Sequence, residues 1–269
     1  MNWTAATSEG IEYLERPGAG AVMVLLHGIG SNAASFTPLL AHLPENLRVI
    51  AWNAPGYGGS APLARDWPQA QDYAAALSDF LDRLGIECCA MLGHSLGALM
   101  AASFAAGAAN RVSHLTLAAP AIGHGVPPGE ALSAPAQARI EALERLGAPA
   151  FAAERAARLL HLPEREPEAL ALVEGAMAQV SMPGYGQAAR MLASGRLLDD
   201  AERLWVPTDV IVGAEDRITP PEGARRLHGV LRGRARGRFT ELPGLGHALY
   251  QQGPARFAET LSTTAAAAA

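Results

Sequence analysis

The residues best suited to covalent chemistry lie in one short run, Gly93-His94-Ser95-Leu96-Gly97. This Gly-x-Ser-x-Gly run follows an expected strand over residues 88–92 and precedes an expected helix over residues 96–106, which is the context that a nucleophile elbow requires. The flanking glycines let the chain turn sharply, so the Ser95 hydroxyl projects from the end of the strand. Unpaired N–H groups at the start of the helix favour developing negative charge there. We therefore predict that Ser95 is a nucleophile.

A serine hydroxyl attacks poorly unless a base takes its proton, so a histidine and a carboxylate are expected to accompany Ser95. Asp216 follows an expected strand over residues 208–212, and His247 lies in the glycine-rich loop that begins at Gly244. The order serine, acid, histidine is the one in which the partners of this motif follow along the chain. We predict Asp216 as the acid and His247 as the base, with Glu215 left open as a competitor for the acid.

Acyl transfer also needs backbone donors for the oxygen that becomes negatively charged. The loop His27-Gly28-Ile29-Gly30 follows the first apolar strand, and we assign one donor to the N–H of Ile29, with Gly30 as the alternative. The N–H of Leu96, directly after the nucleophile, is the expected second donor. His27 is interpreted as a brace for its loop. His94 is expected to pack or hydrogen-bond below the nucleophile.

Alternating strands and helices are expected to position these residues. Continuous apolar runs such as residues 22–26 are typical of strands that are buried on both faces, as in a parallel sheet. Strands are predicted over residues 11–15 (an antiparallel edge), 22–26, 47–52, 88–92, 112–118, 208–212 and 239–242, and helices over residues 36–42, 69–84, 96–106, 221–231 and 254–261. This alternation predicts an α/β fold, with a mostly parallel central sheet and helices on both of its faces.

The alternation stops over residues 123–201, where four amphipathic helical stretches are expected, at residues 134–146, 149–162, 166–179 and 185–197. This pattern predicts an inserted all-helical cap over a body made of residues 1–122 and 202–269. The cap would cover Ser95 and shape an apolar pocket, as small-molecule sites usually have. The expected substrate-binding residues are Ile29, Phe36, Met182, Tyr185 and Ile218; Met182 and Tyr185 flank the Pro183-Gly184 break.

Composition excludes several other kinds of chemistry. All 21 cationic residues are arginine, so neither a Schiff-base lysine nor a phosphate-loop lysine is present. The formal net charge of −5 argues against nucleic acid or an anionic membrane as a partner. The two cysteines, Cys88 and Cys89, are too few for a disulfide scaffold or a cysteine-based zinc site. We expect no metal and no cofactor, with a small molecule as the substrate.

The two ends of the sequence and one basic cluster carry further expectations. Residues 1–10 are polar and lack the pattern of a signal peptide, so a cytoplasmic protein is expected. The alanine run 265–269 is given no function. A basic cluster near the carboxyl end could dock an acidic acyl-carrier protein, but we interpret it as a solvated face. The cluster consists of Arg225, Arg226, Arg232, Arg234, Arg236 and Arg238.

Taken together, these residues resemble the α/β-hydrolase superfamily over nearly the whole chain. The resemblance rests on His27-Gly28, on the turn Pro55-Gly56-Tyr57-Gly58-Gly59-Ser60, on the elbow around Ser95, and on Asp216 and His247, all in order. Within the superfamily the chain looks most like small capped carboxylesterases, enol-lactonases and pimeloyl-carrier-protein esterases. The resemblance implies a serine hydrolase that cleaves a small carboxylic ester or a lactone through an acyl-enzyme.

Two alternative functions stay open at this point. One is a carbon–carbon bond hydrolase or a cofactor-free oxygenase on the same scaffold, although such hydrolases usually have Asn before the nucleophile and Trp after the histidine. Here those positions hold His94 and Ala248. Haloalkane dehalogenases and epoxide hydrolases use Asp at the elbow, so Ser95 argues against both. The other alternative is a non-catalytic ligand-binding protein of the same fold, which would not need all three of Ser95, Asp216 and His247.

Overall fold

The computed structural model describes residues 3–262, and the alanine run 265–269 lies outside them. In this part of the chain one eight-stranded sheet forms, in the order β1-β2-β4-β3-β5-β6-β7-β8. The antiparallel edge pairs β1 with β2 and β2 with β4, and the other neighbours are parallel. The strands are β1 (Thr4–Ser8), β2 (Ile11–Arg16), β3 (Val22–Leu26), β4 (Arg48–Trp52), β5 (Cys89–His94), β6 (Val112–Ala118), β7 (Thr208–Gly213) and β8 (Arg236–Leu242).

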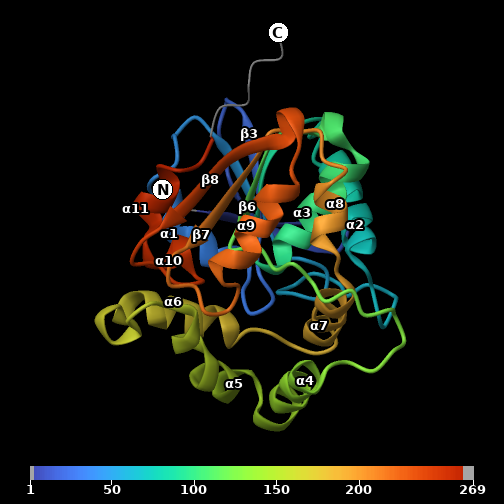
Figure 1. Ribbon diagram of the computed structural model, residues 1–269, viewed down its shortest axis with the longest axis vertical. Helices are drawn as coiled ribbons and strands as arrows, with labels where there is room; N and C mark the ends of the chain where they lie inside the picture. Colours follow the sequence, from blue (N-terminus) through green and yellow to red (C-terminus); the bar gives the residue numbers. More distant parts are fainter. Residues whose placement is uncertain (1–2, 263–269) are drawn as a thin grey trace.

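Helices cover both faces of this sheet (Figure 1). On one face lie α2 (Ala70–Arg83), α3 (Leu96–Gly107), α8 (Leu197–Ala201) and α9 (Pro221–Val230), and on the other lie α1 (Thr37–Leu40), α10 (Leu249–Gln252) and α11 (Pro254–Ala258). Successive side chains of a strand point to opposite faces. Accordingly, Val24 and Leu26 belong to the core under α3, whereas Met23 and Leu25 belong to the core under α10. The predicted α/β fold with a mostly parallel sheet is confirmed.

The segment between β6 and β7 contains helices but no strand. It holds α4 (Ala134–Leu146), α5 (Ala148–Arg155), α6 (Pro167–Met177) and α7 (Gly184–Ser194), with the short 3-10 turns η3 (Ala156–Leu159) and η4 (Pro163–Arg165). In Figure 1, α4 to α6 form a layer at one end of the sheet. We call the segment from α4 to α7 the cap. The following helix, α8, lies inside the predicted insertion but packs against α3 and α9 of the body.

Several elements differ from the sequence-based expectation. The strand β1 was not expected, because its residues are largely exposed and its only pairing is with β2. The strand β8 begins earlier, at Arg236, after the 3-10 turn η5 (Gly233–Ala235). The last expected helix, over residues 254–261, is the shorter α11, and α10 before Gly253 was not expected. The turns η1 (Ala33–Phe36) before α1 and η2 (Ala109–Arg111) before β6 were not expected either. None of the described helices is long and apolar enough to span a membrane.

Candidate active site

Ser95 lies at the turn between β5 and α3 in a conformation that side chains rarely adopt. Its backbone has φ +53° and ψ −111°, and its N–H donates a hydrogen bond to Ala118 O at 2.9 Å. Neither flanking glycine leaves room for a side chain. A Cβ on Gly93 would lie 2.5 Å from the carbonyl oxygen of Gly97, and a Cβ on Gly97 would collide with the carbonyl of Leu26. The predicted sharp turn between a strand and a helix is present.

The loops after β7 and β8 bring Asp216 and His247 into contact. His247 Nδ1 lies 2.8 Å from Asp216 Oδ2, and both side chains are almost completely buried. The other carboxylate oxygen, Oδ1, accepts hydrogen bonds from the backbone N–H groups of Ile218 and Thr219. Glu215 is used elsewhere, since its Oε2 accepts a hydrogen bond from the N–H of Gly244. Asp216, and not Glu215, is therefore the carboxylate that contacts the histidine.

The charge of Asp216 is set by two opposing effects. Burial raises the pKa of this carboxyl, but the neighbouring His247 and the hydrogen bonds from Thr219 outweigh it and hold the pKa below its usual value. Asp216 is therefore an anion at neutral pH and accepts a hydrogen bond from Nδ1 of His247. This leaves Nε2 of the neutral imidazole with the free lone pair, which is the form that a general base needs.

Thr219 is a further member of this cluster that sequence reasoning missed. Its hydroxyl lies 2.8 Å from Asp216 Oδ2, 3.1 Å from His247 Nδ1 and 3.0 Å from the carbonyl oxygen of Ala119. One side chain thus links the acid, the imidazole and the segment after β6. The available signal was weak, because an Asp followed by a Thr three residues later is common in ordinary turns.

Two more buried histidines support the site without facing the substrate as bases. His94 donates from Nε2 to the carbonyl oxygen of His247 at 2.9 Å, and burial, together with His247, lowers its pKa to about 3. His27 donates from Nδ1 to Gly28 O and accepts at Nε2 from the N–H of Ala54. Burial lowers its pKa to about 4. Both rings are therefore neutral at physiological pH and hold backbone segments in place.

The expected donor loop lies directly beside Ser95. A Cβ on Gly28 would be 3.1 Å from Ser95 Cβ, so a side chain there would press on the serine. Ile29 follows in the lining of the cavity, and its carbonyl oxygen accepts a hydrogen bond from the Tyr57 hydroxyl at 2.8 Å. Leu96 is the first residue of α3, so its N–H has no acceptor within the helix.

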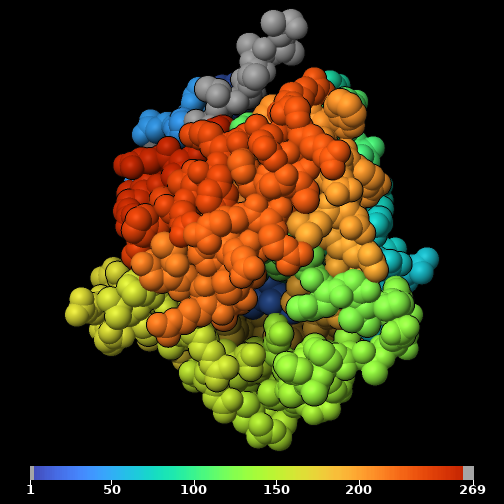
Figure 2. Space-filling view, viewed as in Figure 1, coloured from blue at the N-terminus to red at the C-terminus, as the bar shows by residue number. Residues whose placement is uncertain are grey.

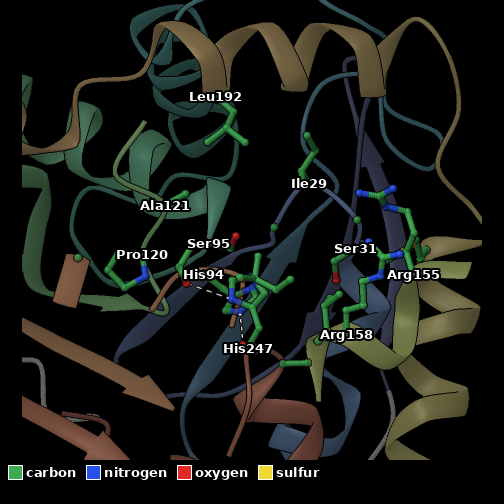
Figure 3. Close-up of a pocket in the computed structure, with 18 of the residues that line it drawn as sticks. Ile29, Ser31, His94, Ser95, Pro120, Ala121, Arg155, Arg158, Leu192 and His247 are labelled. Atoms are coloured by element: carbon green, nitrogen blue, oxygen red, sulfur yellow. Dashed lines mark hydrogen bonds between the residues drawn. The ribbon is translucent and has the colours of Figure 1, made fainter. Parts of the chain in front are cut away.

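These groups line a cavity of about 570 Å³ between the sheet and the cap. Figure 2 shows a hollow between the orange body and the green cap, with dark blue residues from early in the chain at its floor. Ser95 and His247 line the cavity, and Figure 3 shows them drawn with Pro120 and Ala121 beside them. A volume of this size is typical of sites for small molecules.

Three of the five expected substrate-binding residues line this cavity, and two do not. Ile29, Tyr185 and Ile218 are in the lining. Phe36 is fully buried in the core under α10, where its ring stacks on Tyr250 with centroids 4.5 Å apart, because η1 turns it toward the sheet. Met182 is 38% exposed and lies against Gly186 at the start of α7, outside the cavity. The expectations for Phe36 and Met182 are therefore wrong.

The cavity also has charged lining residues that the sequence analysis did not select. They are Arg139, Arg155 and Arg158 of the cap, and Glu222 of α9. Arg226, a member of the basic cluster, also lines the cavity. In contrast, several members of the basic cluster near the carboxyl end have structural partners. Arg225 pairs with Glu241 at 2.6 Å, and Arg238 pairs with Asp209 at 2.7 Å. Among residues 3–262, no group of three or more histidine, cysteine or acidic side chains is arranged to hold a metal ion.

The sheet order, the elbow at Ser95 and the cap together define a hydrolase of the α/β-hydrolase type. The model of the family "serine aminopeptidase, S33" matches residues 18–252, and the chain therefore belongs to this family of α/β-hydrolases. Among relatives, the chain is 27% identical over 258 residues to an uncharacterized protein of Mycobacterium tuberculosis, which covers 89% of this chain and 74% of the relative. It is 29% identical over 238 residues to the pimeloyl-[acyl-carrier protein] methyl ester esterase of Neisseria meningitidis, covering 81% of this chain and 83% of the relative.

Solved structures show the same fold. The enol-lactonase of Burkholderia xenovorans superposes with a TM-score of 0.82 at 24% identity, over 96% of this chain and 97% of the enol-lactonase. A thermophilic esterase from Thermogutta terrifontis gives a TM-score of 0.78 at 23% identity, over 96% of each chain. These similarities establish an α/β-hydrolase fold that is shared with esterases and lactonases.

Proposed function

We propose that the protein is a serine hydrolase that cleaves a small carboxylic ester or a lactone through an acyl-enzyme on Ser95. The observation that carries the proposal is the buried contact between His247 Nδ1 and Asp216 Oδ2 beside a cavity that Ser95 also lines. A protein that only held a ligand would have no need to bury an ionised carboxylate against an imidazole at the cavity wall. The family match and the related methyl ester esterase support this reaction class.

The reaction begins with proton transfer from the Ser95 hydroxyl to His247 Nε2. Ser95 Oγ attacks the substrate carbonyl, and the carbonyl oxygen becomes an oxyanion that the N–H groups of Ile29 and Leu96 stabilise. His247 then donates its proton to the leaving alcohol, which in a lactone stays attached to the acyl chain. A water molecule, deprotonated by His247, hydrolyses the acyl-enzyme and restores Ser95. Throughout these steps Asp216 stabilises the imidazolium and holds its orientation.

Labelling with a fluorophosphonate probe tests the proposal, because only an activated serine reacts with it. We expect the wild-type protein to be labelled at Ser95 and to hydrolyse p-nitrophenyl esters. Ser95→Ala should lose the label and lower kcat by a factor on the order of 10⁴. Ser181, an exposed residue just before α7, provides the matched control. Ser181→Ala should keep both the label and the activity.

The proposal fails if Ser95→Ala keeps near-normal turnover of esters with an unchanged circular dichroism spectrum. It also fails if the folded wild-type protein neither reacts with the probe nor hydrolyses any ester or lactone of a graded panel. In that second case a binding protein on the same fold would be the better interpretation.

A further inference from the structure

The cap side of the cavity carries a cluster of positive charge. Arg139 comes from α4, Arg155 is the last residue of α5, and Arg158 lies in η3, and all three line the cavity that Ser95 lines. In Figure 3, Arg155 and Arg158 lie together near Ser31, across the drawn cavity from Pro120 and Ala121. Arg155 and Arg158 therefore lie on the opposite side of the cavity from Pro120 and Ala121, and Ser95 lines the same cavity.

No acidic side chain among residues 3–262 forms an ion pair with this cluster. None of the ion pairs between described residues includes Arg139, Arg155 or Arg158. Arg139 is half-buried, and its Nε is buried without a hydrogen-bond partner in the described part of the chain. Glu222, the one acidic residue in the lining, is exposed on α9 and shares that helix with Arg226 one turn further on.

Arg155 is partly buried, which makes its positive charge less stable. Its guanidinium lies 5.0 Å from the centre of the Phe151 ring, in a partly buried position. Burial lowers the pKa of Arg155, Tyr185 and Glu154 oppose that shift, and the neighbouring Arg139 and Arg158 add to it. Half-buried like charges without a counter-ion destabilise a folded protein. A bound anion would remove that cost and would be attracted strongly for the same reason.

Part of the remaining cavity lining is apolar. Phe151, Val173, Met177 and Leu192 line the cavity, and none of them offers a hydrogen bond to a polar ligand. A ligand that satisfies both parts therefore has an apolar body and one anionic end. An arginine guanidinium binds a carboxylate through two parallel N–H donors, which makes a carboxylate the best-matched small anion.

We propose that the substrate is an ester or lactone whose acyl part carries a second, free carboxylate, bound by Arg139 and Arg155. The scissile carbonyl would then lie at Ser95, with the apolar body of the acyl chain between the two sites. Arg158, which is exposed, adds positive charge at the same wall. The nature of the scissile bond rests on the proposed function, whereas the anion site rests on the cap arginines alone.

Matched pairs of substrates test the inference. Each pair consists of the monomethyl ester of a dicarboxylic acid of about four to eight carbons and the methyl ester of the monocarboxylic acid of equal length. These lengths suit a cavity of the observed size. We expect kcat/KM for the anionic member to exceed that for the neutral member by roughly tenfold or more at the best length, because charge-assisted hydrogen bonds are strong.

Substitutions then locate the anion site. Arg139→Gln and Arg155→Gln should each reduce the anionic-to-neutral ratio of kcat/KM by roughly tenfold, mainly by raising KM for the anionic ester. Arg165→Gln is the matched control, since Arg165 is an exposed arginine of the cap that does not line the cavity. This variant should leave the ratio unchanged.

A binding measurement separates the inference from the proposed function. Ser95→Ala should bind the free dicarboxylate in calorimetry, and adding Arg155→Gln should abolish that binding. Ester hydrolysis that depends on Ser95 but shows no preference for the anionic esters, or a preference unmoved by both arginine variants, would overturn the inference alone. Arginine-dependent binding of the dicarboxylate without any hydrolysis would keep the anion site and reject the proposed reaction.

Discussion

Thr219 contacts both Asp216 and His247, so its hydroxyl should fix how these two side chains meet. We expect Thr219→Val, which keeps the shape but removes the hydroxyl, to lower kcat by about 10- to 100-fold. A hydrogen bond to a charged group contributes about 1.5–3 kcal/mol, and about 1.4 kcal/mol corresponds to a tenfold change in rate. Steady-state kinetics on an ester at saturation measures this loss.

Thr219→Ser is the control for this experiment, because it keeps the hydroxyl and should restore most of the rate. A Thr219→Val variant with unchanged kcat would show that Asp216 and the backbone suffice to orient His247.

The site residues differ in how far the sequence could predict their positions. The approach of Asp216 and His247 at the cavity that Ser95 lines was predictable because a glycine-flanked serine and the order of acid and base are specific, whereas the place of Thr219 depends only on proximity in the folded chain.

Tyr185 of α7 and Met182, just before that helix, are close in the sequence but differ in their surroundings. Tyr185 is buried, lines the cavity and packs edge-on against Phe151 with centroids 5.5 Å apart. Met182 is exposed and lies outside the lining. We expect Tyr185→Ala to change the ratio of kcat/KM between short and long acyl esters several-fold, since one methylene in an apolar pocket is worth about 1–3 kcal/mol. Met182→Ala should leave that ratio unchanged.

A panel of p-nitrophenyl esters of increasing chain length measures both variants, with probe labelling of Ser95 as the check that the site is intact. Equal profiles for wild type and Tyr185→Ala would place Tyr185 in the packing of the cap and not in substrate choice. The contrast between Tyr185 and Met182 explains why sequence alone selected both. They flank the same break, and which side of the cap each one faces depends on how α7 docks on the body.

Docking of α7 depends on two glycines from different parts of the chain. A Cβ on Gly56 would lie 2.5 Å from Gly184 Cα, and a Cβ on Gly184 would collide with the carbonyl of Gly56. The strands were predictable because long apolar runs such as β3 are distinctive. The contact between Gly56 and Gly184 was not predictable, because each glycine by itself indicates only a turn and does not reveal the close approach of the other.

Buried histidines make the stability of the whole molecule depend on pH. The pKa of His27 is about 4 and that of His94 is about 3 in the folded chain, below the usual value of about 6.5. Between these values the unfolded chain binds protons that the folded chain does not. The free energy of unfolding should therefore be constant above about pH 6.5 and fall below it, by up to about 1.4 kcal/mol per pH unit for each histidine.

Urea unfolding at pH 7, 6 and 5 measures this dependence. His27→Gln can keep the acceptor for the N–H of Ala54 but cannot bind a proton, so the variant should lose less stability than wild type between pH 7 and pH 5. His42→Gln, at an exposed position, should show the wild-type slope. An identical slope in all three proteins would mean that His27 does not contribute to the acid sensitivity.

The positive φ of Ser95 sets the requirement of the proposed reaction for a hydroxyl against the stability of the fold. A glycine adopts such a backbone conformation without steric cost, whereas serine and alanine do not. The most stable residue at position 95 is therefore one that has no hydroxyl at all, and Ser95→Gly should melt at a higher temperature than either wild type or Ser95→Ala. Under the proposed function, selection for thermal stability alone would favour a protein without a nucleophile at this position, and Ser95 is kept at a cost in stability.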